Sequence, residues 1–386
     1  MNVIFLSPGF PPTAPEFCAA LAAEGVTVLG IGDAELQLER QQAAGLTRYV
    51  CEPRMGEHQA LLDAVKSMAE QYGRIDRIEC DGEHWLAAAA RLRDELEIQG
   101  LDAVTLARQR SKLGMAEIFA RAEIAHPPGV SAADGTAVRR LAEKYGYPLV
   151  FKPDVGSGAV ATFKVNSESE LQAVLGREPQ SDVVQPFIAG DIITFDGLAD
   201  RRGRLVFWTS HVYDTGIMEV RQAELDGHYY SLRELPSGLE ALGRRAVAAF
   251  AVRERFFHVE FFRHLDGTFT ALEMNLRPPG GFTTDMMNAA CDIDVYRLWA
   301  AVVAGRDLEG FRFERRYHTA HAGRRAGRNY RLDTATLVHE LGEILVVERA
   351  IPPAFAATMG DTMYMLRHRD LAELRQAIAL VQDQSG

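Results

Sequence analysis

The segment from residue 256 to residue 277 constrains the fold more than any other part of the chain. It reads FFHVEFFRHLDGTFTALEMNLR, with Asp266-Gly267 between two alternating runs. Asp-Gly is a strong signal for a two-residue hairpin turn. Pairing residues outward from that turn places Glu260 opposite Glu273 and His258 opposite Asn275. We therefore predict an antiparallel β-hairpin over about residues 256–277.

The two faces of this hairpin differ in chemistry. Alternation puts one face in the apolar core with Phe257, Val259, Phe261, Leu272, Met274 and Leu276, and gives the other His258, Glu260, Glu273, Asn275 and Arg277. Opposed side chains lie about 4.5–5.5 Å apart, and like charges at that distance repel. Two facing carboxylates and an amide oxygen suit Mg²⁺, which takes its remaining ligands from water and phosphates. The alternative is a solvated polar face.

A second informative stretch, PLVFKPDVGSGAVATFKV, spans residues 148–165 and predicts a strand, a glycine loop and a strand. Lys152 ends the first strand, and Gly156 and Gly158 follow in the loop. Glycines allow backbone N–H groups to form an anion-binding concavity, and the lysine ammonium can reach a phosphate. The loop is either a phosphate cradle of this kind or a plain hairpin turn.

The first 100 residues alternate apolar strands with helical segments. We expect strands at 3–7, 26–31 and 74–80 and helices at 14–24, 59–72 and 83–97, which is typical of a doubly wound parallel sheet. Beyond them we expect helices at 103–123, 135–146, 236–251 and 293–304 and strands at 182–188 and 191–199. A further α/β piece is expected at 335–381.

Composition excludes several functional classes. The formal net charge is −11, from 42 Lys and Arg against 53 Asp and Glu, which argues against a nucleic-acid binder with a basic surface. A short arginine-rich run over about residues 312–331 has no regular series of aromatics on which successive bases could stack, so we interpret it as a solvated or substrate-side face. No apolar run reaches the length of a membrane span, and the N-terminus does not resemble a signal peptide. Four dispersed cysteines favour a reduced, cytoplasmic protein.

Taken in order, these motifs resemble the ATP-grasp superfamily, which includes the L-amino-acid ligases and D-alanine–D-alanine ligase. The resemblance covers roughly residues 1–310 and lies in the strand-end lysine with its glycine loop, a following hinge strand, and an acid followed thirteen residues later by Glu-x-Asn-x-Arg. It implies α/β and α+β architecture. The expected parts are an N-terminal α/β domain at 1–103, an ATP-grasp domain at 104–310 with a lid at about 124–186, and a C-terminal α/β extension at 311–386.

The resemblance also implies roles for single residues. The nucleotide-binding residues would be Lys112, Lys152, Gly156, Ser157, Gly158, Gln185, Phe187, Ile188 and Asp191. Glu260, Glu273 and Asn275 would hold Mg²⁺, with Mn²⁺ as an alternative ion. Arg277 and Lys152 would be catalytic, with Arg277 facing an acyl phosphate. His258 is either a partner of a metal ligand or a structural histidine.

Two residues depart from the family pattern. The hinge usually begins with Glu, and here it is Gln185. The ribose-binding acid usually lies seven residues after that Glu, whereas Asp191 lies one residue earlier. Because Pro186 has no N–H, the hinge donor to adenine would be Ile188.

The activity implied is an ATP-dependent carboxylate–amine ligase that forms an acyl phosphate and releases ADP and phosphate. Its partners would be small-molecule carboxylates and amines, and the family also suggests a homodimer. The alternatives are a small-molecule kinase, a carboxylase, or an ATP-binding module without activity. His211, Tyr213 and Asp285 are candidates for the wall of the substrate site, and each has a structural role as the alternative.

Overall fold

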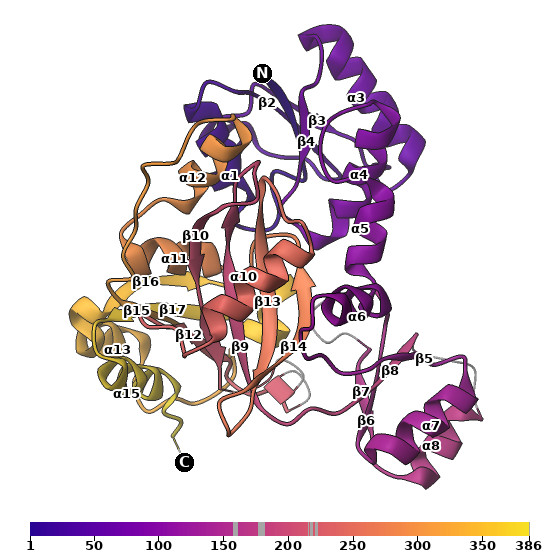
Figure 1. The fold of residues 1–386 in the computed structure, drawn as a ribbon. Helices are drawn as coiled ribbons and strands as arrows, with labels where there is room; N and C mark the ends of the chain where they lie inside the picture. Colours follow the sequence, from indigo (N-terminus) through magenta and orange to yellow (C-terminus); the bar gives the residue numbers. More distant parts are fainter. Residues whose placement is uncertain (157–160, 177–181, 215, 217–218, 221–222, 386) are drawn as a thin grey trace.

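The computed structural model describes residues 1–156, 161–176, 182–214, 216, 219–220 and 223–385. Within these ranges the strands form three sheets, of four, nine and four strands. Figure 1 shows the first four-stranded sheet at the top of the molecule, the nine-stranded sheet at the centre and the other four-stranded sheet set off to one side. No helix in these ranges combines the length and apolar character that crossing a bilayer requires.

The N-terminal sheet is parallel, with the order β3-β2-β1-β4. Its strands are β1 (Asn2–Leu6), β2 (Thr27–Gly32), β3 (Arg48–Cys51) and β4 (Arg77–Glu79), and its helices are α1 (Ala14–Ala23), α2 (Leu38–Ala43), α3 (His58–Tyr72), the 3₁₀ turn η1 (Glu83–Trp85) and α4 (Leu86–Glu95). Alternate residues of β1 enter two separate cores, one with α1 and one with α3 and α4. Helices on both faces make this the predicted doubly wound arrangement.

The single helix predicted over residues 103–123 is wrong. The chain forms α5 (Ala103–Arg110) and α6 (Lys112–Arg121), separated at Ser111, whose backbone is extended. The Ser111 hydroxyl accepts a hydrogen bond from the Gly114 N–H, which makes Ser111 the N-cap of α6. At Gly114 a Cβ atom would lie 2.1 Å from the Arg108 carbonyl oxygen, so only glycine allows this close helix-to-helix turn. Lys112 therefore begins a new helix.

The small sheet set off in Figure 1 has the order β5-β8-β6-β7. It comprises β5 (Val130–Ser131), β6 (Leu149–Lys152), β7 (Phe163–Val165) and β8 (Val183–Pro186), packed against α7 (Gly135–Tyr145) and α8 (Glu168–Leu175). The predicted glycine loop joins the antiparallel strands β6 and β7, as expected. Of the predicted loop residues, Gly156 is described, whereas Ser157 and Gly158 lie outside the described residues.

The central sheet has the order β14-β13-β9-β11-β12-β15-β17-β16, and β10 also pairs with β9. Its strands are β9 (Asp191–Ala199), β10 (Leu205–Thr209), β11 (His211–Tyr213), β12 (His228–Ser231), β13 (Arg255–Arg263), β14 (Phe269–Asn275), β15 (His318–Arg324), β16 (Leu345–Ala350) and β17 (Thr362–His368). The strands that follow residue 310 thus continue the sheet that contains the predicted hairpin.

The helices that accompany the central sheet are α10 (Leu239–Ala249), α11 (Thr283–Cys291), α12 (Val295–Val303), α13 (Thr334–Leu341), the 3₁₀ turn η2 (Gly342–Ile344), α14 (Pro353–Met359) and α15 (Leu371–Gln382). Helix α12 packs on α1, and the buried Trp299 contacts the rings of Phe5 and Phe17 edge-on. The N-terminal sheet and the central sheet therefore share a core, which fixes the N-terminal loops beside the hairpin.

The hairpin forms with the predicted pairing at its polar positions, Glu260 with Glu273 and His258 with Asn275. Its turn is longer than predicted, because the Thr268 carbonyl pairs with the His264 N–H and leaves a three-residue loop, 265–267. A register shift next to Glu260 restores the predicted pairing farther from the turn. This shift makes Leu272 an exception to the predicted apolar face: Ala271 is buried opposite Phe261, and Leu272 lines a cavity.

Candidate functional site

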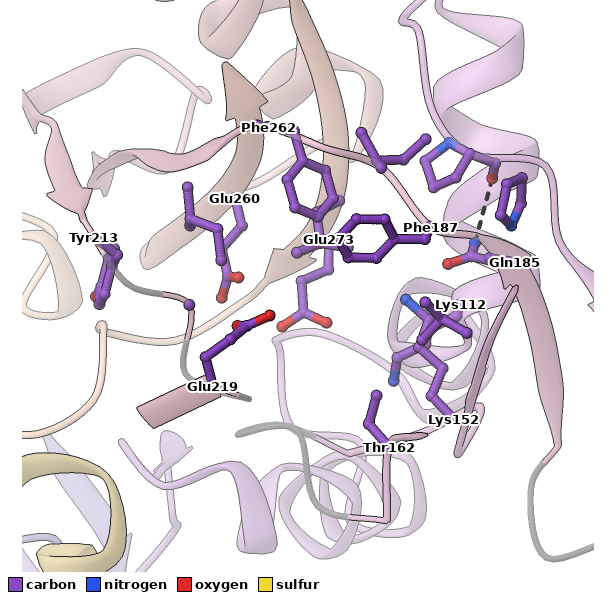
Figure 2. Close-up of a pocket in the computed structure, with 18 of the residues that line it drawn as sticks. Lys112, Lys152, Thr162, Gln185, Phe187, Tyr213, Glu219, Glu260, Phe262 and Glu273 are labelled. Carbon is purple, nitrogen blue, oxygen red and sulfur yellow. Dashed lines mark hydrogen bonds between the residues drawn. The ribbon is translucent and has the colours of Figure 1, made fainter. Parts of the chain in front are cut away.

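The hairpin and the small sheet enclose a cavity of about 660 Å³. Figure 2 shows Lys112 and Lys152 pointing into it together with Glu260 and Glu273. Residues from α6, β6, β8, the 187–191 connection and the hairpin line this space. The structure thus brings the predicted cationic and anionic groups, which are far apart in the sequence, to one cavity.

Both lysines are buried, each with 8% of its surface exposed. The Lys112 ammonium donates to the Asp154 carbonyl at 3.4 Å and to the Gly156 carbonyl at 3.3 Å, which ties α6 to the glycine loop. Burial lowers the pKa of Lys152 to about 8, and the nearby charge of Lys112 adds to this effect, while Glu273 opposes it. Within the described residues neither ammonium has a carboxylate at salt-bridge distance, so this pair suits a polyanionic ligand.

The two facing carboxylates have opposite pKa shifts. Burial and the charge of Glu260 raise the pKa of Glu273. Burial also acts on Glu260, but the hydrogen bond and charge of His258 outweigh it and lower the pKa of that carboxyl. The Asn275 amide donates to Glu273 Oε1 at 3.0 Å, and Asn275 does not itself line this cavity.

The oxygen atoms of Glu260, Glu273 and Asn275 are of the kind that a hard divalent cation prefers as ligands. Two half-buried, directly paired carboxylates repel one another, and a cation between them would relieve that repulsion. Within the described residues, no three His, Cys, Asp or Glu side chains gather closely enough to hold a metal alone. A cation here would therefore depend on phosphate or water oxygens as well.

The predicted hinge borders the same cavity through Gln185, Phe187, Ile188 and Asp191. The Phe187 N–H donates to the Pro148 carbonyl at 3.0 Å, so it is already used within the fold. The Gln185 amide donates to the Pro127 carbonyl at 3.3 Å, as Figure 2 shows. Asp191 pairs with Arg263 at 2.9 Å across β9 and β13, directly beside the cavity.

Two acids that line this cavity, Asp214 and Glu219, were not predicted. Glu219 lines the cavity and pairs with Lys164 at 3.2 Å, and Figure 2 shows its carboxylate turned toward Glu273. Lys164 also lies 4.1 Å from the centre of the Phe187 ring. The sequence around residue 219 has no motif that could have singled this residue out.

A second cavity, of about 380 Å³, adjoins the first. The two cavities share Tyr213, Glu260 and Glu273 in their walls. Arg277 lines the second cavity, where its Nε donates to Glu83 Oε2 at 3.1 Å. The same Glu83 side chain also pairs with Arg110 at 2.8 Å, so the orientation of Arg277 depends on a residue of the N-terminal region.

Several walls of the second cavity come from segments that the sequence did not mark. Asp81 is buried there, one of its oxygens has no partner within the described residues, and burial raises its pKa to about 7. On another side of this cavity the rings of Tyr229 and His321 stack, with their centres 5.2 Å apart. Helix α14 contributes Phe355 and Met359 to the wall. An acid directly after a buried strand was the available signal for Asp81.

The three residues predicted as candidates for the substrate wall have different locations in the structure. Tyr213 lines both cavities. Asp285 lines neither, and it accepts hydrogen bonds from the Tyr296 hydroxyl and from Arg349. His211 is fully buried and also lines neither cavity. Its Nδ1 lies 2.6 Å from Asp196 Oδ2, within the sheet.

Asp196, in the middle of β9, was not predicted as a site residue. It is fully buried and also lies 2.6 Å from His258 Nδ1, and His258 Nε2 lies 3.0 Å from Glu260 Oε1. The carboxylates on both sides raise the pKa of His258 to about 10 despite its burial. An acid in the middle of a mostly apolar strand was the signal in the sequence.

Among known proteins, similarity in sequence is limited. No protein-family model matches the chain. A pyruvate carboxylase subunit of Methanothermobacter thermautotrophicus is 24% identical over 273 residues, which cover 64% of this chain and 55% of that protein. The chain thus spans about half the length of this relative.

Similarity to solved structures extends over nearly the whole chain. The L-amino acid ligase of Bacillus licheniformis is 17% identical, with a TM-score of 0.78 over 99% of this chain and 97% of that one. N5-carboxyaminoimidazole synthetase of Staphylococcus aureus is 14% identical, with a TM-score of 0.75 over the same shares. The biotin carboxylase domain of the Hydrogenobacter thermophilus 2-oxoglutarate carboxylase, solved with MgADP and bicarbonate, is 16% identical, with a TM-score of 0.71 over 97% and 89%.

The architecture of the chain and its similarity to these solved structures point to the same fold. The N-terminal doubly wound sheet precedes the hairpin and small-sheet pair in the order that the sequence resemblance implies. The chain has the ATP-grasp fold.

Proposed function

We propose that this protein is an ATP-dependent ligase that joins a small-molecule carboxylate to an amine and releases ADP and phosphate. The observation that supports this most strongly is that two cavities meet at the Glu260–Glu273 pair. The larger cavity contains buried lysines suited to a nucleotide, and the smaller contains Arg277. A phosphoryl group leaving the first cavity would pass directly into the second.

In this proposal the nucleotide occupies the larger cavity. Lys112 and Lys152 bind its phosphates beside Gly156, which also lines this cavity. The 185–188 segment meets the base, with Ile188 as the backbone donor because the Phe187 N–H already binds Pro148. Asp191 at the edge of the cavity would bind the ribose, in exchange for its contact with Arg263.

The chemistry balances in two steps. A carboxylate oxygen of the first substrate bonds to the γ-phosphorus as the bond between that phosphorus and the β–γ bridging oxygen breaks, which releases ADP. The amine nitrogen then bonds to the acyl carbon, the bond from that carbon to the phosphate oxygen breaks, and the nitrogen loses a proton. Glu260, Glu273 and Asn275 would hold Mg²⁺, which when bound neutralises charge on the phosphates.

Arg277 is the residue we assign to the acyl centre. It lines the smaller cavity beside both carboxylates, and Glu83 holds its guanidinium in place. A fixed cation at that point stabilises the oxyanion that develops when the amine attacks. Tyr213, which is in both walls, would contact substrate at the junction.

We further propose that the small sheet with α7 and α8 is the lid, within about residues 124–186, that covers the nucleotide. The accompanying divisions are an N-terminal domain at 1–103, a catalytic domain at 104–310 and a C-terminal extension at 311–386. A closed lid would exclude water from the acyl phosphate.

A second candidate is carboxylation, in which bicarbonate takes the place of the organic carboxylate. Two similarities favour it, to the pyruvate carboxylase relative and to the carboxylase domain solved with bicarbonate. The same residues would activate either acid, so the choice depends on what fills the smaller cavity.

The test is a substrate screen in which ADP release is coupled to the mass of the product. Paired carboxylates and amines, amino acids among them, are offered with MgATP, and bicarbonate is offered with each amine. Ligation predicts a product formed with loss of water, whereas carboxylation adds carbon dioxide and a kinase adds phosphate. Glu273→Gln should abolish the product, and the exposed strand residue change Glu348→Gln should not. ATP binding without any product across the panel would contradict the proposed activity.

A further inference from the structure

A chain of hydrogen-bonded polar side chains, buried except at its Glu260 end, crosses the central sheet toward the paired carboxylates. It runs from His211 on β11 through Asp196 on β9 to His258 and Glu260 on β13. His258 is directly opposite Asp196, and Glu260 is directly opposite Thr194, so all of these residues share one face of the sheet. The next pairs in the same rows are Asn275 and Glu273 on β14.

Asp196 has no access to solvent or to either cavity, so it cannot contact substrate itself. Its carboxylate accepts three hydrogen bonds, from the Thr194 hydroxyl, His211 Nδ1 and His258 Nδ1. The Thr194 hydroxyl in turn accepts from the His211 backbone N–H at 3.0 Å. A buried carboxylate with this many donors is held in one orientation, and it fixes each donor in return.

His258 is the link to the candidate metal site. Each of its ring nitrogens faces a carboxylate, Asp196 at 2.6 Å and Glu260 at 3.0 Å. Ionised carboxylates only accept hydrogen bonds, so both ring nitrogens donate and neither offers a lone pair to a cation. His258 is therefore not a metal ligand, and its contact constrains one oxygen of Glu260.

We propose that Asp196 and His258 are positioning residues, which hold Glu260 Oε1 so that the free oxygens of Glu260 and Glu273 receive the divalent cation that accompanies the nucleotide. This inference rests on the proposed function, since it assumes a nucleotide–metal complex in the larger cavity. Hydrogen-bonded partners behind metal-ligating side chains set ligand orientation, and their loss costs about 10-fold to about 100-fold in metal affinity.

The test measures how much Mg²⁺ strengthens ADP binding. Calorimetry gives the ADP dissociation constant with Mg²⁺ and with EDTA, and the ratio of the two isolates the metal contribution. We expect Asp196→Asn and His258→Leu to reduce this ratio about 10-fold or more, while ADP affinity in EDTA changes less than about twofold. His258→Gln has one donor nitrogen in place of two ring nitrogens that face different carboxylates, so it should lie between His258→Leu and wild type.

The matched control is Asp200→Asn, the same chemical change just after β9, where the acid pairs with Arg204 outside both cavities. This variant should leave the ADP dissociation constants with Mg²⁺ and with EDTA unchanged. A titration of Mn²⁺ in the presence of ADP, followed by electron paramagnetic resonance, supplies a second reading that does not depend on turnover. Thermal melts identify any variant that fails to fold. If Asp196→Asn does not fold, the ratio is measured with His258→Gln, which is the mildest change.

The outcomes separate this inference from the proposed function. An unchanged ratio in folded Asp196→Asn or His258→Gln would overturn the positioning role while wild-type nucleotide binding stood. ADP binding in the wild type that Mg²⁺ does not strengthen would overturn it as well and remove the metal assignment. If the wild type bound no ADP at all, the proposed function itself would fail.

Discussion

Lys152 gives the nucleotide cavity a pH dependence whose sign and size follow from its burial. Its pKa is lowered to about 8, so the unliganded ammonium loses its proton as the pH rises above that value. Phosphate binding favours the charged form, because a charge-assisted hydrogen bond contributes about 1.5–3 kcal/mol. Affinity for ADP should therefore be nearly full below about pH 7.5 and fall as the pH rises above about 8, by a total that cannot exceed the contribution of the charge itself.

At about pH 9.5 only about 3% of free Lys152 remains protonated, against about three quarters at about pH 7.5. With a charge contribution of about 1.5–3 kcal/mol, wild-type ADP affinity should be about 7-fold to about 20-fold weaker at the higher pH. The ADP phosphates ionise at about pH 6 and do not change charge across this range. At the lower pH, Lys152→Met should weaken binding by about 10-fold to about 150-fold. That difference between wild type and variant should shrink to a few fold at the upper pH.

Calorimetric titration of ADP at several pH values measures both effects. Lys152→Arg keeps its charge throughout the range and should abolish the pH dependence, even if its affinity is lower. Lys144→Met removes an exposed lysine of α7 and should reproduce the wild-type curve. A wild-type affinity that stayed constant from about pH 7.5 to about pH 9.5, or a Lys152→Met variant with wild-type affinity, would refute the assignment of Lys152 to the phosphates.

Three further changes test other parts of the site and of the fold. Glu273→Gln should lower ATP turnover by about 100-fold or more, since metal neutralisation of phosphate charge contributes several kcal/mol, and wild-type turnover would contradict the metal assignment. Glu83→Gln loosens Arg277 and should lower the turnover number about tenfold without changing the KM for ATP; a change in that KM alone would contradict the role given to Arg277. Gly243→Ala places a Cβ 2.2 Å from the Phe195 ring and should destabilise the fold by about 1–3 kcal/mol in urea unfolding, whereas an unchanged midpoint would show that the ring yields freely.

The hairpin could be predicted because its information is local. Alternation and the Asp-Gly turn determined which residues oppose one another, and the pairs that matter, Glu260 with Glu273 and His258 with Asn275, form as expected. The turn was one residue too short in the prediction, and the register shift beside Glu260 compensates for that error. The predicted position of Leu272 is wrong as a result, because a shift of one residue moves a side chain from one face of the sheet to the other.

Features that depend on distant contacts could not be predicted. The helix break at Ser111 follows from a capping hydroxyl and from the close approach of Gly114 to Arg108, which helical periodicity does not reveal. The second cavity gathers residues of the N-terminal loops, β12, β15 and α14, which only the tertiary fold brings together. Asp196 was recognisable as an acid in an apolar strand, but its partners His211 and His258 became evident only from the strand order.

The most direct test of carboxylate activation at the Glu260–Glu273 junction follows the oxygen atom. The enzyme is given MgATP, an amine and a carboxylate substrate labelled with ¹⁸O in its carboxyl group, and the released phosphate is examined by mass spectrometry. Transfer through an acyl phosphate predicts that each phosphate carries one ¹⁸O atom from the carboxylate in the wild type, and that Glu273→Gln releases no labelled phosphate. Phosphate that contains oxygen from ATP and water alone would show that the carboxylate is not phosphorylated and would contradict the proposed chemistry.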